Sequence, residues 1–253
     1  MQLKDKVAII TGAGSGFGEG IAKRFAAEGA KVIVNDINAA GGERVAAEIR
    51  KTGGAAQFVK ADVTRGADWA ALVTATQANF GGLDIVVNNA GWTHRNKPFM
   101  EVSEAEFDQV YSTNVKSIYL SARHVLPLFK ARGGGCFVNI ASTGGVRPRP
   151  GLTVYNSSKG AVILMSKSMA AEFGPDQVRV NCINPVFCPD TGLSAEFAGG
   201  QNTPEVQAKF RATVPMGRLA TVKDVAKAAL FLASDEAAFI SGTCLEVDGG
   251  RCC

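Results

Sequence analysis

The sequence predicts an α/β fold in which helices cover both faces of a parallel sheet. Apolar runs of strand length recur along the chain, segments of helix length separate them, and the first run leads into a glycine-rich turn. Nearly continuous apolar runs are typical of strands that are buried on both faces. The predicted strands cover residues 7–11, 31–36, 56–62, 83–88, 135–141, 178–184 and 244–248.

The first half of the chain alternates between strands and helices. It starts with MQLKDKVAIITG, a short apolar run without a small-residue cleavage site, which indicates a strand and not a signal peptide. Amphipathic segments predict helices over 18–28, 39–51 and 69–80. Gly29 is well placed to end the first of these helices.

The second half carries two further local signals. Residues Ser103 to Glu106 read SEAE, a capping box that starts a long helix towards Phe129. Residues 186–203 are rich in glycine, proline and small polar side chains, so we expect an irregular lid over a site. No repeat, low-complexity tract or linker divides the chain, and we therefore expect a single domain over residues 1–253.

Composition excludes several classes of function. The 253 residues are 46% hydrophobic and 20% charged, as in ordinary globular proteins. The net charge is only +4 and the basic residues are scattered, which argues against a nucleic-acid surface. No apolar run approaches the ~20 residues that span a bilayer, so we expect no membrane partner. Six cysteines without a CxxC pair suggest no metal site or redox motif, and reduced buried thiols indicate a cytoplasmic protein.

The glycine turn after the first strand predicts a phosphate-binding site. Residues 11–18 read TGAGSGFG, which is not the strict GxGxxG pattern but Thr-Gly-x-x-x-Gly-x-Gly. Glycines allow the backbone to turn tightly and to approach a pyrophosphate, which then lies at the positive N-terminus of the following helix. The alternative is a turn with a purely structural role.

Asp36 favours the nucleotide interpretation and selects the cofactor. It closes the second strand, where its carboxylate can accept hydrogen bonds from both hydroxyls of an adenine ribose. The same charge repels a 2′-phosphate, and neither Ser15 nor Ile37 supplies a cation to reverse that preference. We therefore expect NAD(H) to be preferred over NADP(H); the alternative is an exposed aspartate at a strand end.

Tyr155 and Lys159, in the run YNSSK, are candidates for proton transfer. Positions i and i+4 share one face of a helix. A cation ~4 Å from a phenolate, at an effective dielectric of ~20, stabilises it by about 4 kcal/mol, which predicts that Tyr155 titrates near pH ~7. Ser142 ends the strand 135–141, at the edge of the sheet where ligands bind. The alternative is two surface residues on an ordinary helix.

Taken together, these motifs resemble the single-domain branch of the short-chain dehydrogenase/reductase family. The resemblance rests on TGAGSGFG, NNAG at 88–91, Asn114, Ser142 and YNSSK, and it covers essentially the whole chain. It implies a three-layer Rossmann-type doubly wound sheet of about seven mostly parallel strands. It also implies one NAD(P)-binding domain over 1–253, with a substrate-loop region at about 186–213.

The resemblance also implies the roles of individual residues. Tyr155 would be the general acid or base, and Lys159 would lower its pKa and bind the nicotinamide ribose. Ser142 would hold the substrate oxygen, and Asn114 would support a water in a proton relay; the alternative for Asn114 is a solvent-facing helical residue. The implied cofactor-binding residues are Gly12, Ser15, Gly16, Phe17, Gly18, Asp36, Asp62, Val63, Asn89, Ala90, Gly91, Tyr155, Lys159 and Thr191.

The sequence departs from the family pattern after the sixth predicted strand. Val186 stands where the family has glycine, and Thr191 falls about one residue late for its contact with the carboxamide. The expected pocket walls, Trp92, His94, residues 143–146, Phe187 and Cys188, favour a small or medium apolar carbonyl compound. His94 is interpreted as satisfied at the pocket rim, and Arg147 and Arg149 as solvated or subunit-contact residues rather than ligands of an anionic substrate.

These observations predict a metal-free, NAD-dependent oxidoreductase that interconverts a small-molecule secondary alcohol and a ketone. The C-terminal run LEVDGGRCC resembles the family tail that packs across a twofold axis, which implies a homotetramer or a homodimer. Three alternatives stay open: a 3-oxoacyl-(acyl-carrier-protein) reductase, a sugar dehydrogenase of the glucose type, and a non-catalytic NAD(H)-binding sensor or scaffold.

Overall fold

The sheet has the topology that the sequence predicts. The computed structural model describes residues 1–253 and contains one seven-stranded sheet with the order β3-β2-β1-β4-β5-β6-β7. All neighbouring strands run parallel, which confirms the α/β class. The strands are β1 (Val7–Thr11), β2 (Lys31–Asp36), β3 (Ala55–Lys60), β4 (Ile85–Asn88), β5 (Gly135–Ile140), β6 (Val178–Pro185) and β7 (Cys244–Val247).

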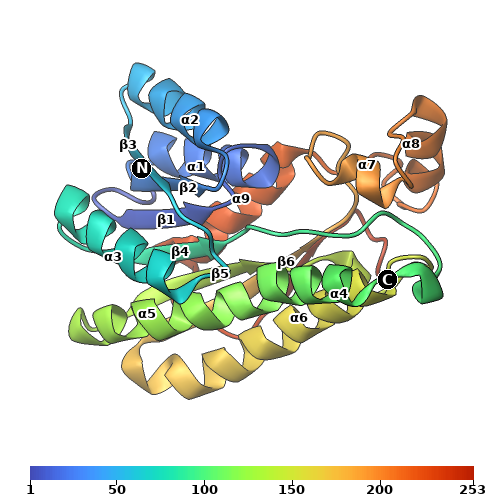
Figure 1. The fold of residues 1–253 in the computed structure, drawn as a ribbon. Helices are drawn as coiled ribbons and strands as arrows, with labels where there is room; N and C mark the ends of the chain where they lie inside the picture. The colour runs from blue at the N-terminus through green and yellow to red at the C-terminus, as the bar shows by residue number, and fades with distance from the viewer.

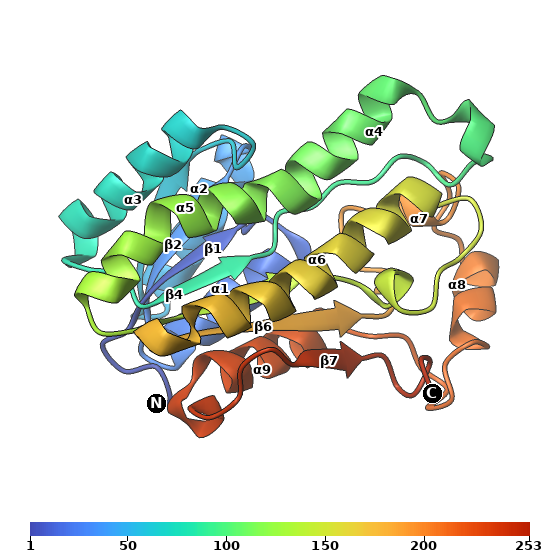
Figure 2. The same ribbon diagram turned by 90° about the horizontal axis from the view of Figure 1, so that it is seen from below.

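Helices cover the two faces of this sheet as separate layers, above and below it in Figure 1. One layer consists of α1, α2 and α9, and the other of α3, α5 and α6, while α4 continues the line of α5 (Figure 2). The bounds are α1 (Gly16–Ala27), α2 (Ala39–Lys51), α3 (Gly66–Phe80), α4 (Glu104–Tyr111), α5 (Ser117–Ala131), α6 (Thr153–Phe173), α7 (Ser194–Phe197), α8 (Pro204–Arg211) and α9 (Val222–Ala233).

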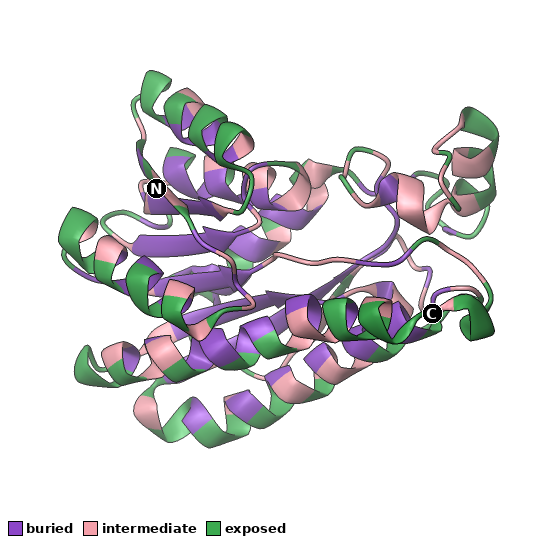
Figure 3. Cartoon of the chain, in the orientation of Figure 1, coloured by how far each residue is buried: buried purple, intermediate pink, exposed green.

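The hydrophobic core is divided by the sheet into two clusters. Successive strand residues point to opposite faces, so Ile9 packs towards α3, α5 and α6 while Ile10 packs towards α1, α2 and α9. The five inner strands, β2, β1, β4, β5 and β6, are buried along most of their length (Figure 3), while the edge strands β3 and β7 are largely half-buried or exposed. Burial of each large aliphatic side chain stabilises the fold by about 1.5–3 kcal/mol, which explains the continuous apolar runs of the sequence.

The order of the strands places a crevice between β1 and β4. From β1 the chain moves outward through β2 and β3, and it then returns to the other side of β1 as β4. Loops that leave the carboxyl ends of β1 and β4 therefore diverge, and ligands of open α/β sheets bind at such a point. No helix of the structure is long and apolar enough to cross a membrane.

The long helix expected after the SEAE motif begins as predicted but is interrupted. The capping box is present, since Ser103 Oγ accepts from the Glu106 amide at 3.3 Å and Glu106 Oε2 accepts from the Ser103 amide at 2.9 Å. A π-helical turn over Ser112–Lys116 then separates α4 from α5. Such turns re-aim side chains and are frequent at functional sites; this one carries Asn114.

The segment expected as an irregular lid contains regular structure. Within residues 186–203 the only helix is the four-residue α7, and α8 follows directly after, inside the substrate-loop region expected at about 186–213. They lie beyond the carboxyl ends of the strands, on the side of the sheet where the crevice opens (Figures 1 and 2).

Candidate active site

A cavity of about 450 Å³ lies at the carboxyl ends of the strands and collects almost all predicted site residues. Gly18 and Asn114 are the two exceptions, because neither contributes to the lining. The predicted residues that do line it are Gly12, Ser15, Gly16, Phe17, Asp36, Asp62, Val63, Asn89, Ala90, Gly91, Ser142, Tyr155, Lys159 and Thr191.

The glycine turn forms one end of the cavity. Gly12 and Gly16 have φ values of +61° and +56°, in the left-handed region that favours glycine. Gly18 is required for packing instead, because a Cβ there would overlap the Gly12 carbonyl oxygen. Ser15 makes no side-chain cap to α1, so the first N–H groups of that helix are free to bind an anion. The turn therefore fits a pyrophosphate.

Hydrogen bonds between β1 and β4 hold this turn in place. Asn89 Nδ2 donates to the carbonyl oxygens of Thr11 and Gly12, at 2.8 and 3.1 Å. The amides of Asn89 and Ala90 both donate to Thr11 Oγ1 at 3.0 Å. Thr11 begins the motif TGAGSGFG, but the sequence did not predict its role in holding the turn. Its position directly before the first glycine is the only local sequence signal for that role.

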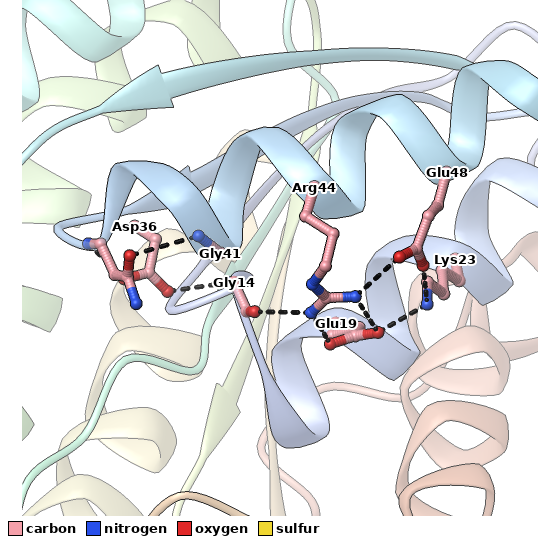
Figure 4. A network of polar contacts seen from close by, with 8 residues as sticks. Gly14, Glu19, Lys23, Asp36, Gly41, Arg44 and Glu48 are labelled. Carbon is pink, nitrogen blue, oxygen red and sulfur yellow. Dashed lines mark hydrogen bonds and ion pairs between the residues drawn. The ribbon is translucent and has the colours of Figure 1, made fainter.

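Asp36 lies beside the turn and already accepts two backbone hydrogen bonds. Its Oδ2 accepts from the Gly14 amide and its Oδ1 from the Asn38 amide, both at 2.8 Å (Figure 4). Each carboxylate oxygen keeps a lone pair for a ribose hydroxyl. The position expected for ribose recognition is thus occupied by a fixed carboxylate at the cavity wall.

The sequence predicted no cation beside the glycine turn, but the structure places Arg44 there. Arg44 of α2 donates to the Gly14 carbonyl oxygen at 3.1 Å. Its guanidinium is paired with Glu19 at 2.6 Å and Glu48 at 2.9 Å, and Lys23 joins both carboxylates (Figure 4). Hydrogen bonds with Arg44 and Lys23 hold the pKa of Glu19 below its ordinary value despite burial. The charge of Arg44 is therefore compensated within the protein.

Tyr155 and Lys159 lie side by side on α6 and are both buried. Burial raises the pKa of Tyr155 to about 12, against the smaller, opposing effect of the nearby Ser142 hydroxyl. Burial also lowers the pKa of Lys159 to about 8. The predicted pKa near neutrality is therefore wrong for this structure. Lys159 Nζ lies 5.7 Å from the centre of the Tyr155 ring and donates to the Ile140 carbonyl oxygen at 2.8 Å instead.

Ser142 is held at the end of β5 by its own loop. It caps a short turn, and its Oγ accepts from the Gly144 amide at 3.0 Å. Both Ser142 and Tyr155 line the cavity, and a Cβ on Gly144 would lie 3.4 Å from Ser142 Oγ and 3.5 Å from the Tyr155 ring, so the serine and the phenol lie together at the cavity wall as predicted.

Asn114 is buried, so the solvent-facing alternative is wrong. Its Oδ1 accepts from the Trp92 amide at 2.8 Å, and its Nδ2 donates to Trp92 O and Ser158 Oγ, both at 3.0 Å. A Cβ on Gly91 would lie 3.4 Å from Asn114 Oδ1 and 3.6 Å from Lys159 Nζ. Asn114 thus lies just behind the cavity wall and fixes the loop that follows β4.

The structure also tests the residues expected as pocket walls. Trp92, Phe187, Cys188 and the turn at 143–144 line the cavity. His94 does not: it is buried, and its Nδ1 donates to the Arg95 carbonyl oxygen at 2.8 Å. Val146 points outward and is 46% exposed.

Several wall residues had no sequence signal that placed them in the cavity, and four of them matter for its chemistry. Three of them, Asn156, Phe197 and Phe210, were not singled out, while Arg149 was assigned to solvent or a subunit contact but lines the wall. Phe197 packs edge-on against the ring of Tyr155, with 5.0 Å between the ring centres. These residues come from separate loops and helices that only the tertiary fold brings together.

The two departures from the family pattern are accommodated. Val186 is buried with Cys188, Val214 and Ala220, and its backbone does not need the left-handed conformation that would favour glycine. A Cβ on Gly16 would lie 3.5 Å from the Cα of Thr191, so that threonine packs directly beside the glycine turn and also lines the cavity.

Comparisons with known proteins agree with this geometry. Residues 12–251 match the model of a family described as Enoyl-(Acyl carrier protein) reductase. A 4-formylbenzenesulfonate dehydrogenase of Comamonas testosteroni is 50% identical over 251 residues, which cover 99% of each chain. A 2,5-dichloro-2,5-cyclohexadiene-1,4-diol dehydrogenase of Sphingobium indicum is 40% identical over 256 residues, covering 98% of this chain and 97% of the relative.

A solved structure shows the same fold throughout. The 3-ketoacyl-(acyl-carrier-protein) reductase from Brucella melitensis, in complex with NADH, superimposes with a TM-score of 0.93 at 46% identity. The match covers 99% of this chain and all of that one. With the sheet order, the glycine turn and the Ser142, Tyr155 and Lys159 arrangement, these likenesses show that the chain belongs to the short-chain dehydrogenase/reductase family.

Proposed function

We propose that this protein is an NAD(H)-dependent oxidoreductase that interconverts an alcohol and the corresponding carbonyl compound, with secondary alcohols and ketones as the principal class. One observation carries the proposal. Ser142 and Tyr155 lie close together in the wall of the same cavity that the glycine turn opens, since a Cβ on Gly144 would lie 3.4 Å from Ser142 Oγ and 3.5 Å from the Tyr155 ring. A proton-transferring pair therefore shares its cavity with a dinucleotide-binding turn, which is the arrangement that hydride transfer to or from a nicotinamide needs.

The residues of the cavity fit a nicotinamide dinucleotide. The free N–H groups at the start of α1 would bind its pyrophosphate, and Asp36 would bind the adenine ribose. Asp62 and Val63 would contact the adenine, and Lys159 the nicotinamide ribose. Hydride transfer is the chemistry that this cofactor would supply there. The relative from Brucella melitensis, solved with NADH, supports this assignment.

The chain's own groups handle the proton. In carbonyl reduction the carbonyl carbon receives a hydride, and Tyr155 donates its phenolic proton to the carbonyl oxygen. Ser142 donates a hydrogen bond to that oxygen and stabilises its developing negative charge. A pKa of about 12 keeps Tyr155 protonated at neutral pH, which is the form that donates. Oxidation of an alcohol runs the same steps in reverse.

The preference for NAD(H) over NADP(H) follows from the charges around Asp36. A 2′-phosphate would meet the Asp36 carboxylate directly. Arg44 contacts the turn through the Gly14 carbonyl oxygen, but Glu19 and Glu48 compensate its charge, so it attracts a phosphate only weakly. Both features favour an unphosphorylated ribose.

The relatives favour ring-bearing substrates but leave a second candidate. The names of the two dehydrogenases contain an aromatic aldehyde and a cyclic diol. The Brucella melitensis relative is a 3-ketoacyl-(acyl-carrier-protein) reductase, so a 3-oxoacyl thioester is the second candidate substrate. A sugar dehydrogenase has no specific observation in its favour. The homotetramer and the cytoplasmic location stay predictions.

The test is the variant Tyr155→Phe, assayed for turnover and for NADH binding. The panel contains cyclic and aromatic alcohols, ketones, aldehydes, sugars and a 3-oxoacyl thioester, each with both cofactors. The wild type should turn over one chemical group with NAD(H). Tyr155→Phe should bind NADH normally, by fluorescence titration, and lose turnover by a factor of about 100 or more, because the proton donor is gone. Tyr119→Phe, at a residue that is 51% exposed, is the matched control.

Two results would contradict the proposal. Near-normal turnover by Tyr155→Phe would exclude Tyr155 as the acid and base. NADH binding by the wild type without turnover of any member of the panel would favour a non-catalytic sensor instead.

A further inference from the structure

The substrate end of the cavity is built from aromatic side chains. Phe187 follows β6 and Phe210 lies in α8, and their rings stack with 4.0 Å between centres and an angle of 6° between planes. Phe197 of α7 packs edge-on against the Tyr155 ring. Trp92 completes this lining. Such walls are typical of pockets that bind a planar ring.

Arg149 brings a positive charge into this aromatic wall. Its guanidinium carbon lies 4.2 Å from the centre of the Phe210 ring. Because Phe187 stacks on that ring as well, the two must occupy opposite faces of Phe210. Arg149 lines the cavity and is half-buried, while Arg147, two residues away, does not line it. Sequence patterns predict the same solvated or subunit-contact role for both arginines, but only Arg149 lines the cavity.

The charge of Arg149 has no acidic partner within the chain. None of the ion pairs of the structure includes it. Its one side-chain hydrogen bond goes from Nη2 to Thr213 Oγ1 at 3.3 Å, so most donors of the guanidinium are free. Burial, together with the nearby Arg251 and Arg147, lowers the pKa of Arg149 to about 10. An uncompensated cation in a partly buried wall favours binding of an anion.

The backbone of Arg149 is fixed relative to the proton donor. Asn156, the residue after Tyr155 in α6, donates from Nδ2 to the Arg149 carbonyl oxygen at 2.9 Å. Asn96 Nδ2 donates to the following carbonyl, of Pro150, at 3.0 Å. The loop that carries the arginine is therefore held against the helix that carries the phenol. A rigid substrate with its carbonyl at one end and an anionic group at the other would match such a pair of fixed points.

We propose that Arg149 is the anion-recognition residue of the substrate pocket and that the substrate is an aromatic carbonyl compound, or its alcohol, bearing a sulfonate or carboxylate. This inference rests on the oxidoreductase function proposed above. The relative that is 50% identical is named for an aldehyde of this chemistry, an arene that carries both a formyl and a sulfonate group. Phe210 holds the guanidinium by a cation–π contact, and the aromatic wall stacks on the substrate ring.

The test compares substrates that differ only in the anion. Reduction of 4-formylbenzenesulfonate, 4-formylbenzoate and benzaldehyde with NADH is measured for the wild type, Arg149→Gln, Arg149→Lys and Arg147→Gln. Arg147→Gln removes the same charge from the same loop but outside the cavity, so it controls for long-range electrostatics. The wild type should prefer the anionic aldehydes over benzaldehyde, chiefly through KM.

Arg149→Gln should lower kcat/KM for both anionic aldehydes roughly ten- to hundredfold, because a charge-assisted hydrogen bond is lost. Its kcat/KM for benzaldehyde should change less than about twofold, and Arg149→Lys should recover part of the loss. Equal losses for charged and neutral aldehydes would show that Arg149 is only structural. Turnover of benzaldehyde by the wild type without a preference for the anions would overturn the proposal.

Binding of benzenesulfonate separates this inference from the proposed function. Thermal unfolding of the wild type should shift upward with benzenesulfonate and not with benzyl alcohol, and the shift should disappear in Arg149→Gln but persist in Arg147→Gln. If no aldehyde or alcohol is turned over but this pattern appears, the proposed reaction fails and the anion site stands. A shift of the same size in the wild type and Arg149→Gln would refute the anion site.

Discussion

Replacement of Asp36 by alanine should reverse the cofactor preference. A charge ~5 Å from a phosphate, at an effective dielectric of ~20, contributes about 3 kcal/mol of repulsion per unit of phosphate charge. A 2′-phosphate carries between one and two charges, and Asp36 is only half-buried, so solvent screening brings the net penalty back to about 3 kcal/mol. That penalty corresponds to roughly 100-fold weaker binding of NADP(H).

The structure adds a second contribution to this reversal. The amides of Gly14 and Asn38 now donate to Asp36 at 2.8 Å, and its removal frees both for phosphate oxygens. Asp36→Ala should therefore bind NADPH roughly 100-fold more tightly than the wild type. It should bind NADH about tenfold less tightly, because hydrogen bonds from the ribose hydroxyls are lost.

The assay is fluorescence titration of NADH and NADPH with the wild type, Asp36→Ala and Asp62→Asn. Asp62 lines the same cavity, and its Oδ1 accepts from the amide and hydroxyl of Thr64. Asp62 is proposed to contact the adenine, which both cofactors share. Asp62→Asn should therefore weaken the binding of NADH and of NADPH by a similar factor. An Asp36→Ala variant that still prefers NADH would refute the assignment of Asp36 to the ribose.

Two further predictions concern packing and buried charge. Gly18→Ala should destabilise the protein by about 3 kcal/mol in urea unfolding and weaken NADH binding, because its Cβ would overlap the Gly12 carbonyl oxygen. Gly160→Ala is the control: its Cβ would make only an ordinary contact, 3.8 Å from the Gly145 carbonyl oxygen, so its free energy of unfolding should stay the same or rise. Equal losses of stability in the two variants would contradict the packing argument. The pKa of Lys159 falls from 10.5 in the unfolded chain to about 8 in the folded one, so the unfolded chain binds more protons between these values and stability should rise with pH across that window. The free energy of unfolding should rise by about 3 kcal/mol, and this rise should be absent in Lys159→Met. The measurement is urea unfolding from about pH 7 to about pH 10. If the wild type and Lys159→Met show the same dependence on pH, the pKa of Lys159 is not lowered by burial.

Much of the site could be predicted because its signals are local in the sequence. The backbone of one turn requires glycine at positions 12 and 16, and close packing requires it at position 18. The i, i+4 spacing places Tyr155 and Lys159 on one helical face. The position of Ser142 could also be predicted, because it directly follows a predicted strand and all parallel strands end at the same edge of the sheet.

The electrostatics of the pair could not be predicted in the same way. Spacing alone suggested that Lys159 lowers the pKa of Tyr155, but the structure buries both groups and directs the ammonium to Ile140. Burial and hydrogen-bond direction depend on what packs around α6, which spacing does not contain. The π-helical turn at Asn114 was missed for a similar reason, because its hydrogen bonds to Trp92 and Ser158 come from other segments.

By itself, the sequence determined the class of the fold and the range of each strand within about two residues, and it predicted the candidate site residues that the structure places around one cavity. These properties follow from local backbone preferences and from the alternation of apolar segments. Only the tertiary structure decided which side chains share the substrate pocket. Arg149 lines the pocket and His94 does not, although both are polar residues in loops and local sequence does not distinguish them. The physical reason is that a pocket wall is assembled from segments that are distant in sequence. Whether a basic side chain in that wall is paired depends on whether any of those segments places a carboxylate beside it.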